Sequence, residues 1–450
     1  MSENTGKKFT FLLIFEELAA GNRLLATRCR LRINQSYKYI QEYQYLLRTS
    51  SYQLPVAFCS YRTIYAKRCN TISILFLIPF LIWGVLSCAP GKKKPSDPNN
   101  IGHYLPVSYA KGFTISDHGK YRKITVLDPW QQSTGIKFEY YLVDRGQNIP
   151  ADLEGKQVIR TPVSSVICLS TSHIGFLSAL NEIASLKALS GAGFVSDPEV
   201  QKAVAAKKVF DVGYDQGINY ELILSLKPDL IMAYGVGGEV TGFINKLRDL
   251  GLNVILNGEY LEETPLAKAE WIKFVGAFYN KDQEAAEYFS KIEKNYNEIK
   301  QKITAKNRPV VLTGLPYKDA WWMAGGHSNL AALIGDAGGE FLWHDNTSRE
   351  SFVVSLEEVV IRSAKADFWI NCGTVNTIDE LISTDSRFAA FPQVRKKAIF
   401  NNNLLVSPDG GNDYWERGVV RPDLILADLV KIFHPECNSS KVFNFYKKIE

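Results

Sequence analysis

The chain has 450 residues and a formal net charge of +5. The charge is concentrated at the start, because residues 1–87 hold 11 Lys and Arg against 4 Asp and Glu, whereas the other 363 residues hold 41 against 43. The near-neutral remainder excludes a basic field for nucleic acid. Only three cysteines follow residue 88, which excludes a disulfide framework. The length is enough for two domains with cores of their own.

Residues 1–66 show no clear hydrophobic period, and the stretch "QSYKYIQEYQYLLRTSSYQ" is rich in Tyr and Gln without a strand or helix repeat. We interpret this segment as a leader that results from an overextended start. A genuine cytoplasmic extension is the alternative.

Residues 67–87 have the order of a secretion signal: basic residues, an apolar run and a small residue. The apolar run, 72–86, is short of the roughly 20 residues that span a membrane. The sequence "VLSC" resembles the bacterial lipobox, which implies cleavage before Cys88 and lipidation of that cysteine. A charged, Pro-rich tether follows over 88–108. A buried core helix with a chance cysteine is the alternative.

An N-terminal lobe is expected over residues 109–270. Alternating β-rich residues over 109–145 predict a small antiparallel meander that decorates it. From 158 onward short apolar strands alternate with helical stretches, which predicts an α/β fold with a mostly parallel sheet.

A long helix is expected in a linking region over 271–308. Its apolar residues are spaced alternately by four and three from Ala285 to Ile303, which indicates one buried stripe. From Lys281 to Ala305 the helix would run roughly 37 Å. The α/β pattern resumes over 309–450, so we expect two Rossmann-like lobes joined by one long helix.

Catalytic and metal-binding patterns are missing from the sequence. The six histidines are scattered, with no pair at metal spacing. His173 begins a helix after a strand, where it faces a cleft or serves in capping or packing. Cys168 and Cys372 lie in apolar runs and are expected to be buried.

Aromatic residues are instead clustered in loops that follow strands, at the edge where open α/β sheets bind ligands. Rings accompanied by one acid and one arginine suit a large, mostly uncharged ligand with a polar rim. Some of the rings are expected to cover hydrophobic surface instead. The candidates are Trp321, Trp322, Phe352, Asp413, Tyr414, Trp415 and Arg417.

Two acids open apolar helices, one in each half of the chain. Asn219 and Ser355 are suitable N-caps, which places Glu221 and Glu357 in first turns, where the helix dipole favours acids. Glu358 fits a capping box with Ser355, which leaves Glu357 free to point outward.

With these features the chain resembles the metal-chelate binding proteins of importers driven by ATP hydrolysis (ABC importers). The segments "QGINYELILSLKPDLIMA" and "VVSLEEVVIRS" are similar to the family's two docking segments. The resemblance implies that Glu221 and Glu357 pair with arginines of a permease dimer in the inner membrane.

The stretch "NDYWERG" looks like the ligand loop of the family's cobalamin-binding member. This likeness implies ligand contacts for Asp413 and Arg417, and Trp322 falls where that member places a cleft aromatic. Asp215, beside Tyr214, stands where a ring is expected.

The resemblance implies a periplasmic protein, lipid-anchored to a bacterial membrane, with no intrinsic cofactor. The candidate loops offer mainly Arg349, Arg417 and Arg421 as cations, so a neutral cobalt corrinoid fits better than an anionic ferric siderophore. Haem stays open, because His173 or Tyr214 could supply an axial ligand.

Two rivals belong to other classes. A metal-cofactor enzyme of related two-lobed fold would need ligating Cys or His inside the cleft. A surface adhesin or structural lipoprotein would not need paired docking acids.

Overall fold

The computed structural model describes residues 103–104, 106–214, 217–235, 237–238, 240–303, 307–317, 320–437 and 442–450. The predicted leader, the signal peptide, Cys88, most of the tether and Asp215 lie outside these residues. Within the described ranges no helix is both long and apolar enough to cross a membrane.

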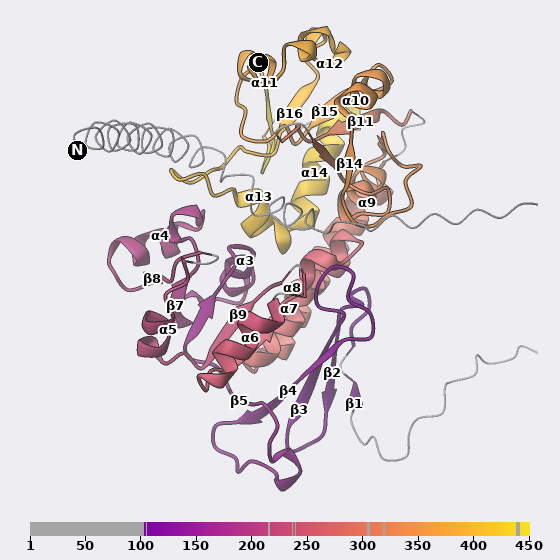
Figure 1. Ribbon diagram of the computed structural model, residues 1–450. Coiled ribbons are helices and arrows are strands. Elements are labelled where there is room, and N and C mark those ends of the chain that lie inside the picture. Colours follow the sequence, from indigo (N-terminus) through magenta and orange to yellow (C-terminus); the bar gives the residue numbers. More distant parts are fainter. Residues whose placement is uncertain are drawn as a thin grey trace, which may run out of the picture. The chain divides into compact units, whose positions relative to one another are not determined.

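The N-terminal lobe contains a five-stranded parallel sheet in the order β10-β9-β6-β7-β8. The chain starts in the central strand β6, adds β7 and β8 on one side, and then adds β9 and β10 on the other. The strands are β6 Val166–Cys168, β7 Leu186–Leu189, β8 Phe210–Asp211, β9 Leu230–Ala233 and β10 Val254–Leu256. The helices between them are α3 Ser172–Ala179, α4 Pro198–Ala205, α5 Tyr220–Leu226 and α6 Val240–Asp249. The predicted α/β lobe is confirmed (Figure 1).

The C-terminal lobe has a sheet in the order β13-β11-β15-β16-β17, parallel except for the last strand. Its strands are β11 Val310–Thr313, β13 Glu340–Phe341, β15 Phe368–Ile370, β16 Ile399–Asn401 and β17 Lys447–Lys448. A separate antiparallel pair is formed by β12 Trp321–Met323 and β14 Phe352–Val354. The helices are α9 Asn329–Asp336, α10 Leu356–Ser363, α11 Ile378–Thr384, α12 Pro392–Arg395, α13 Asp413–Glu416 and α14 Pro422–Phe433. The two lobes are therefore both α/β but differ in strand order.

Short 3-10 helices complete the described elements. They are η3 Ala151–Leu153, η4 Ile183–Ser185, η5 Ala192–Phe194, η7 Glu259–Leu261, η8 Ser386–Ala390, η9 Arg417–Val419 and η10 Pro435–Cys437.

The predicted meander over 109–145 is present as three antiparallel strands, and its sheet is larger than expected, because a fourth antiparallel strand precedes it and a parallel strand follows it. The strands are β1 His103–Tyr104, β2 Phe113–Asp117, β3 Arg122–Leu127, β4 Lys137–Asp144 and β5 Val158–Thr161. β5 pairs in parallel with β4, so the interpretation of residues 158–161 as the start of the parallel α/β part is wrong. Alternate residues of β5 are buried, as expected for a strand with one face on a core.

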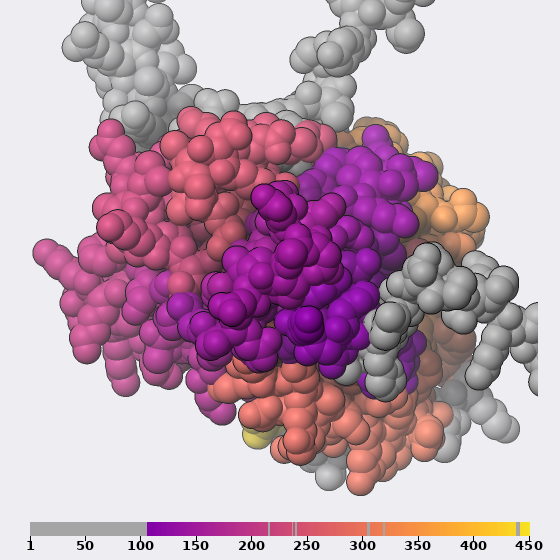
Figure 2. All heavy atoms as spheres, turned by 90° about the horizontal axis from the view of Figure 1, so that it is seen from below, coloured from indigo at the N-terminus to yellow at the C-terminus, as the bar shows by residue number. Residues whose placement is uncertain are grey.

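Two buried carboxylates bind the backbone of the segment that leads into β2 of the meander. Glu270 accepts hydrogen bonds from the backbone N–H groups of 108–110, and Glu262 accepts those of 111–112. Arg122 of β3 pairs with Asp282, the first residue of helix α8 (Asp282–Gln301). The meander is thereby fixed against the helices that precede the C-terminal lobe, and Figure 2 shows its indigo-to-purple atoms as one continuous surface.

The linking region contains two helices, α7 Pro265–Phe278 and α8 Asp282–Gln301. The predicted apolar stripe is confirmed in α8, because Ala285, Phe289, Ile292 and Tyr296 are all buried. α8 has 20 residues, about 30 Å at 1.5 Å per residue, and packs against both α7 and α14. α8 thus contacts its neighbour α7 within the linking region and α14 of the C-terminal lobe.

Candidate functional site

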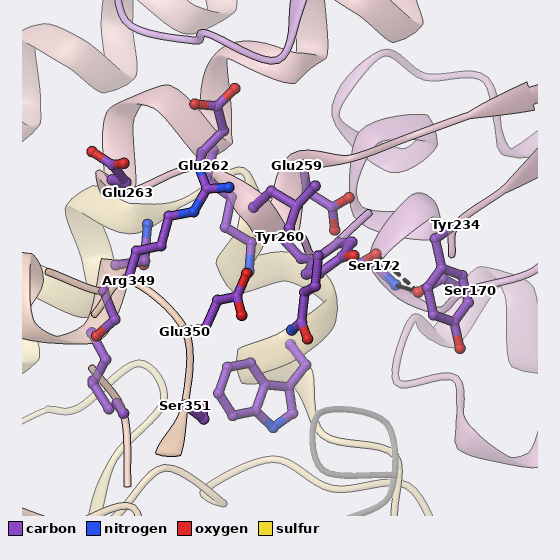
Figure 3. A pocket seen from close by; sticks show the side chains of 18 of the residues that line it. Ser170, Ser172, Tyr234, Glu259, Tyr260, Glu262, Glu263, Arg349, Glu350 and Ser351 are labelled. Atoms are coloured by element: carbon purple, nitrogen blue, oxygen red, sulfur yellow. Dashed lines mark hydrogen bonds between the residues drawn. The ribbon is translucent and has the colours of Figure 1, made fainter. Parts of the chain in front are cut away.

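A cavity of about 240 Å³ lies between the two lobes, and we call it the interlobe cavity. Its N-terminal side is lined by Gln131, Ser170, Thr171, Ser172, Tyr234, Glu259, Tyr260, Leu261, Glu262, Glu263 and Lys268. Its C-terminal side is lined by Ala324, Ser328, Asn329, Leu330, Arg349, Glu350, Ser351, Tyr414 and Trp415. Most of these side chains carry hydrogen-bonding groups. In Figure 3 Ser170, Ser172 and Tyr234 lie together, across from Arg349, Glu350 and Ser351.

The N-terminal wall is built at the carboxyl ends of parallel strands. Ser170 and Ser172 follow β6, and their hydroxyls are 2.9 Å apart. Tyr234 follows β9, the neighbour of β6. The loops after β6 and β9 diverge here because the chain reverses its direction of sheet growth, which is the place where open α/β sheets bind ligands.

The C-terminal wall is built from loops and helix starts. Ser328 caps α9 by accepting the N–H of Ala331 at 3.2 Å. Tyr414 and Trp415 come from the short helix α13, and their rings are 4.4 Å apart and nearly perpendicular. Tyr414 is buried, whereas Trp415 is only half-buried, so Trp415 is the ring more available to a ligand.

Carboxylates outnumber cations in the interlobe cavity. Glu259 is 3% exposed, and burial raises its pKa although Lys268 lies nearby. Glu262 is already used, because it accepts the indole N–H of Trp271 at 2.9 Å as well as backbone N–H groups. Among the residues that the structure describes, the cations of the lining are Lys268 and Arg349. The cavity is therefore poorly suited to a highly anionic ligand.

Of the expected ligand residues that the structure describes, Tyr414 and Trp415 line the interlobe cavity, and the loop cation Arg349 lines it too. Trp321 is 1% exposed and donates its indole N–H to the carbonyl of Thr313. Trp322 and Phe352 are half-buried in the β12–β14 pair, and neither lines the interlobe cavity.

Asp413 and Arg417 line a second cavity, of about 680 Å³. There Arg417 pairs with Asp413 at 2.7 Å, and neighbouring Arg421 pairs with Asp423 at 2.9 Å. Two of the three arginines expected near a ligand are therefore already neutralised by acids, away from the interlobe cavity.

The second cavity borders a direct contact between the lobes. Glu416 of α13 accepts the backbone N–H groups of Ser196 and Asp197, both at 2.7 Å. Gly411 lies so close to the N-terminal lobe that a Cβ there would be 1.5 Å from the carbonyl oxygen of Phe194. Only glycine fits at this position.

His173 is in α3, as expected, but it is fully buried and contacts the ring of Tyr234 edge-on at 6.4 Å. Burial lowers the pKa of His173 to about 3. Neither His173 nor the half-buried Tyr214 lines the interlobe cavity.

Sequence reasoning missed the polar wall of the N-terminal lobe, including Gln131, Ser170, Ser172 and Glu259. A signal existed for Ser170 and Ser172, because they flank the strand-to-helix turn in "STSHIG". Glu259 resembles an ordinary first-turn acid in the sequence, and nothing local marks it as buried. Gln131 belongs to the meander, which we took for decoration.

The two candidate docking acids lie in first turns, as expected. Asn219 accepts the N–H of Leu222 at 2.9 Å and Ser355 accepts that of Glu358 at 3.2 Å, so both predicted caps are confirmed. Glu221 is exposed. The Glu357 side chain is 74% exposed and lies 3.4 Å from Arg387.

The family model described as "Periplasmic binding protein" matches residues 166–402, more than half of the chain. The protein therefore belongs to the periplasmic binding protein family. The meander lies outside the matched residues.

The chain is similar to an uncharacterized lipoprotein of Methanocaldococcus jannaschii, with 28% identity over 418 residues that cover 85% of this chain and 96% of the relative. Among solved structures it is similar to the periplasmic heme-binding protein RhuT from Roseiflexus sp. RS-1, with 21% identity, 61% of this chain and 99% of that chain covered, and a TM-score of 0.49. The periplasmic vitamin B12 binding protein BtuF of Vibrio cholerae is 16% identical, with 62% and 99% covered and a TM-score of 0.45.

Proposed function

We propose that this protein is the substrate-binding component of an ABC importer, and that it captures a metal chelate, preferably a cobalamin-like corrinoid, in the interlobe cavity. The observation that carries the proposal is a cavity at the carboxyl ends of β6, β9 and β10, closed by the rings of the opposite lobe, in a member of the periplasmic binding protein family.

The charge of the cavity supports a corrinoid over an anionic siderophore. Among the described residues of the lining, Lys268 and Arg349 bring positive charge, against four glutamates. A catecholate chelate carries several negative charges and would meet net repulsion there. Serine, glutamine and asparagine side chains suit the neutral amide groups of a corrinoid instead.

Haem is the second candidate, and the structure weakens it. Its axial ligand was expected from His173 or Tyr214, and neither lines the cavity. A haem ligand from the described lining of the cavity would have to be Tyr234, Tyr260 or Tyr414, and all three have partners within the protein. A metal-cofactor enzyme is disfavoured for a similar reason, because Cys168 and Cys372 are fully buried and line neither cavity.

Binding of a large chelate requires the lobes to separate. The cavity of about 240 Å³ is smaller than the roughly 300–1,000 Å³ of typical small-molecule sites. Hinged separation of two domains is a common way to admit such ligands. The contact between Glu416 and the start of α4 would have to loosen as the lobes move apart.

Delivery is proposed to depend on Glu221 and Glu357, which would pair with arginines of a permease dimer, one from each lobe. The protein is proposed to reach the outer face of the membrane through lipidation of Cys88. An archaeal relative described as a lipoprotein supports the anchor, and for the same reason we do not restrict the location to a bacterial periplasm.

Calorimetric titration with cyanocobalamin, ferrioxamine B and hemin tests the ligand. Micromolar or tighter binding of cyanocobalamin supports the proposal. Binding of hemin or ferrioxamine B alone would overturn the corrinoid while keeping the importer role. Binding of none of the three would overturn the chelate class.

Intact-mass analysis tests the anchor independently. We expect a mature chain that begins with a lipid-modified Cys88. An unmodified Cys88 preceded by residues of the signal segment would contradict it.

A further inference from the structure

The meander contributes to the interlobe cavity. Gln131 lines the cavity and belongs to the loop between β3 and β4. This loop, residues 128–136, lies outside residues 166–402, which the family model matches. One described residue of the cavity lining therefore comes from a part of the chain that the family model does not match.

The β3–β4 loop is held firmly by its own residues. Asp128 accepts the N–H of Ile136 at 3.1 Å through its side chain and donates its own N–H to the carbonyl of Ile136 at 2.9 Å. Trp130 is 7% exposed and packs into the apolar cluster of the N-terminal sheet, with Phe138 beside it at 6.0 Å. Trp130 thus anchors the residue next to Gln131 in a core.

The cavity wall beside Gln131 is held by its own hydrogen bonds. The phenol of Tyr260 donates to the carbonyl of Gly235 at 2.6 Å. Tyr260 itself lines the cavity. Asp128 and Gln132 have φ values of 45° and 60°, a conformation that non-glycine residues rarely adopt and that persists where surrounding structure enforces it.

The side chain of Gln131 is therefore placed by a fixed backbone while remaining half-buried at the cavity. Its amide offers two donors and one acceptor and carries no charge. Such a group discriminates between neutral polar ligands by hydrogen bonding. A ligand that leaves the amide without a hydrogen-bond partner in a closed cavity binds with lower affinity.

We infer that the β3–β4 loop is a fixed wall of the ligand site and that Gln131 is a specificity-determining residue that hydrogen-bonds an amide-type group of the chelate. The inference rests on the proposed function, since it states which part of the proposed ligand this wall contacts. It assigns the meander a role in ligand selection.

The binding test compares Gln131→Ala with Thr134→Ala, an exposed position in the same loop. Cyanocobalamin, ferrioxamine B and hemin are titrated into each variant and the unaltered protein. Gln131→Ala should lower the affinity for the chelate that the unaltered protein binds by about five- to ten-fold, because one hydrogen bond is lost. Thr134→Ala should leave the affinity unchanged. Equal affinity of both variants would overturn the role of Gln131 and leave the proposed function standing.

A second measurement needs no ligand. Gln131→Cys and Thr134→Cys are labelled with a maleimide, and the rates are followed by peptide mass spectrometry. Residue 131 should react several-fold more slowly than residue 134, because it faces an enclosed cavity. Equal labelling rates would contradict the assignment of the β3–β4 loop as a wall of the cavity, whether or not any of the three chelates binds.

Discussion

The two lobes supply different chemistry to the interlobe cavity, and they position it differently. In the N-terminal lobe Ser170, Tyr234 and Glu259 lie within three residues of the ends of β6, β9 and β10. In the C-terminal lobe Tyr414 and Trp415 lie 13 and 14 residues beyond the end of β16. Groups at strand ends are held by the sheet, whereas Tyr414 and Trp415 lie on the short helix α13, which a long loop separates from β16. The comparison suggests a rigid hydrogen-bonding wall facing a more adaptable aromatic one.

The lobes also differ in how their outward-facing acids are held. Glu357 lies beside Arg387, which is itself paired with Asp385 at 2.8 Å. Glu221 forms no ion pair with any residue that the structure describes. An exposed pair such as Glu357–Arg387 contributes little free energy, so both acids remain available to a partner.

The largest expected effect comes from reversing both acids at once. In Glu221→Lys with Glu357→Lys, chelate uptake should be abolished, because truncating one partner of an interfacial charge pair costs about 2–5 kcal/mol and two pairs are lost. Chelate affinity and melting temperature should change little. Uptake and calorimetry on the same variant measure both properties.

Glu358→Lys is the matched control for the double reversal. Glu358 lies on the same turn of α10, and its carboxylate pairs with Arg362 of the same helix. Uptake that persists in the double reversal, or that is lost equally in Glu358→Lys, would contradict docking through one acid on each lobe.

A smaller effect is expected at the contact between the lobes. Glu416→Ala leaves the N–H groups of Ser196 and Asp197 without their acceptor. An orphaned buried donor costs about 1–3 kcal/mol, so the free energy of unfolding should fall by that order in urea titrations. Glu199→Ala, which removes an exposed acid from the first turn of α4, should change it by only a few tenths. Equal effects would show that Glu416 does not hold the lobes together.

The same residue predicts a pH dependence. Burial raises the pKa of Glu416 from its usual 4.5 to about 8. A raised folded-state pKa adds stability that is fully present below about 4.5 and is lost as the pH rises through about 8. The unaltered protein should therefore lose more stability between pH 5 and pH 9 than Glu416→Gln, which does not titrate. Parallel profiles for the two proteins would contradict the raised pKa.

Much of the fold could be predicted because its signals are local. The apolar stripe of α8 and the alternation of β2 to β4 need only the spacing of residues along one element. The β5 strand was misplaced because alternation shows that a strand has one buried face and not which sheet it joins. β5 belongs to the meander only through its pairing with β4.

The site was less predictable, since membership of a cavity depends on which residues of distant segments meet. Trp321 and Trp322 are adjacent, yet one is buried in the core and the other is half-buried. The segment containing Asp413, Tyr414, Trp415 and Arg417 lies at the two cavities, and its role in ligand binding stays a prediction. The adjacent rings of Tyr414 and Trp415 line the interlobe cavity, whereas Asp413 and Arg417 on either side of them line the second cavity, which no local pattern shows.

The smallest expected effect tests which of those cavities binds the chelate. Trp415→Ala should lower the affinity for the chelate that the protein binds by about five-fold. Aromatic contacts add roughly 1 kcal/mol to binding beyond the contribution of the buried area. Trp415→Phe keeps a ring and should recover most of the loss. Arg417→Ala removes the partner of Asp413 in the second cavity and should change chelate affinity less than Trp415→Ala, as measured by calorimetry. The opposite order would place the chelate in the second cavity, among the ion pairs of the C-terminal lobe. The hydrogen-bonding groups at the strand ends of the N-terminal lobe would then not contact the ligand. The difference between the two walls of the interlobe cavity would have no role in chelate binding.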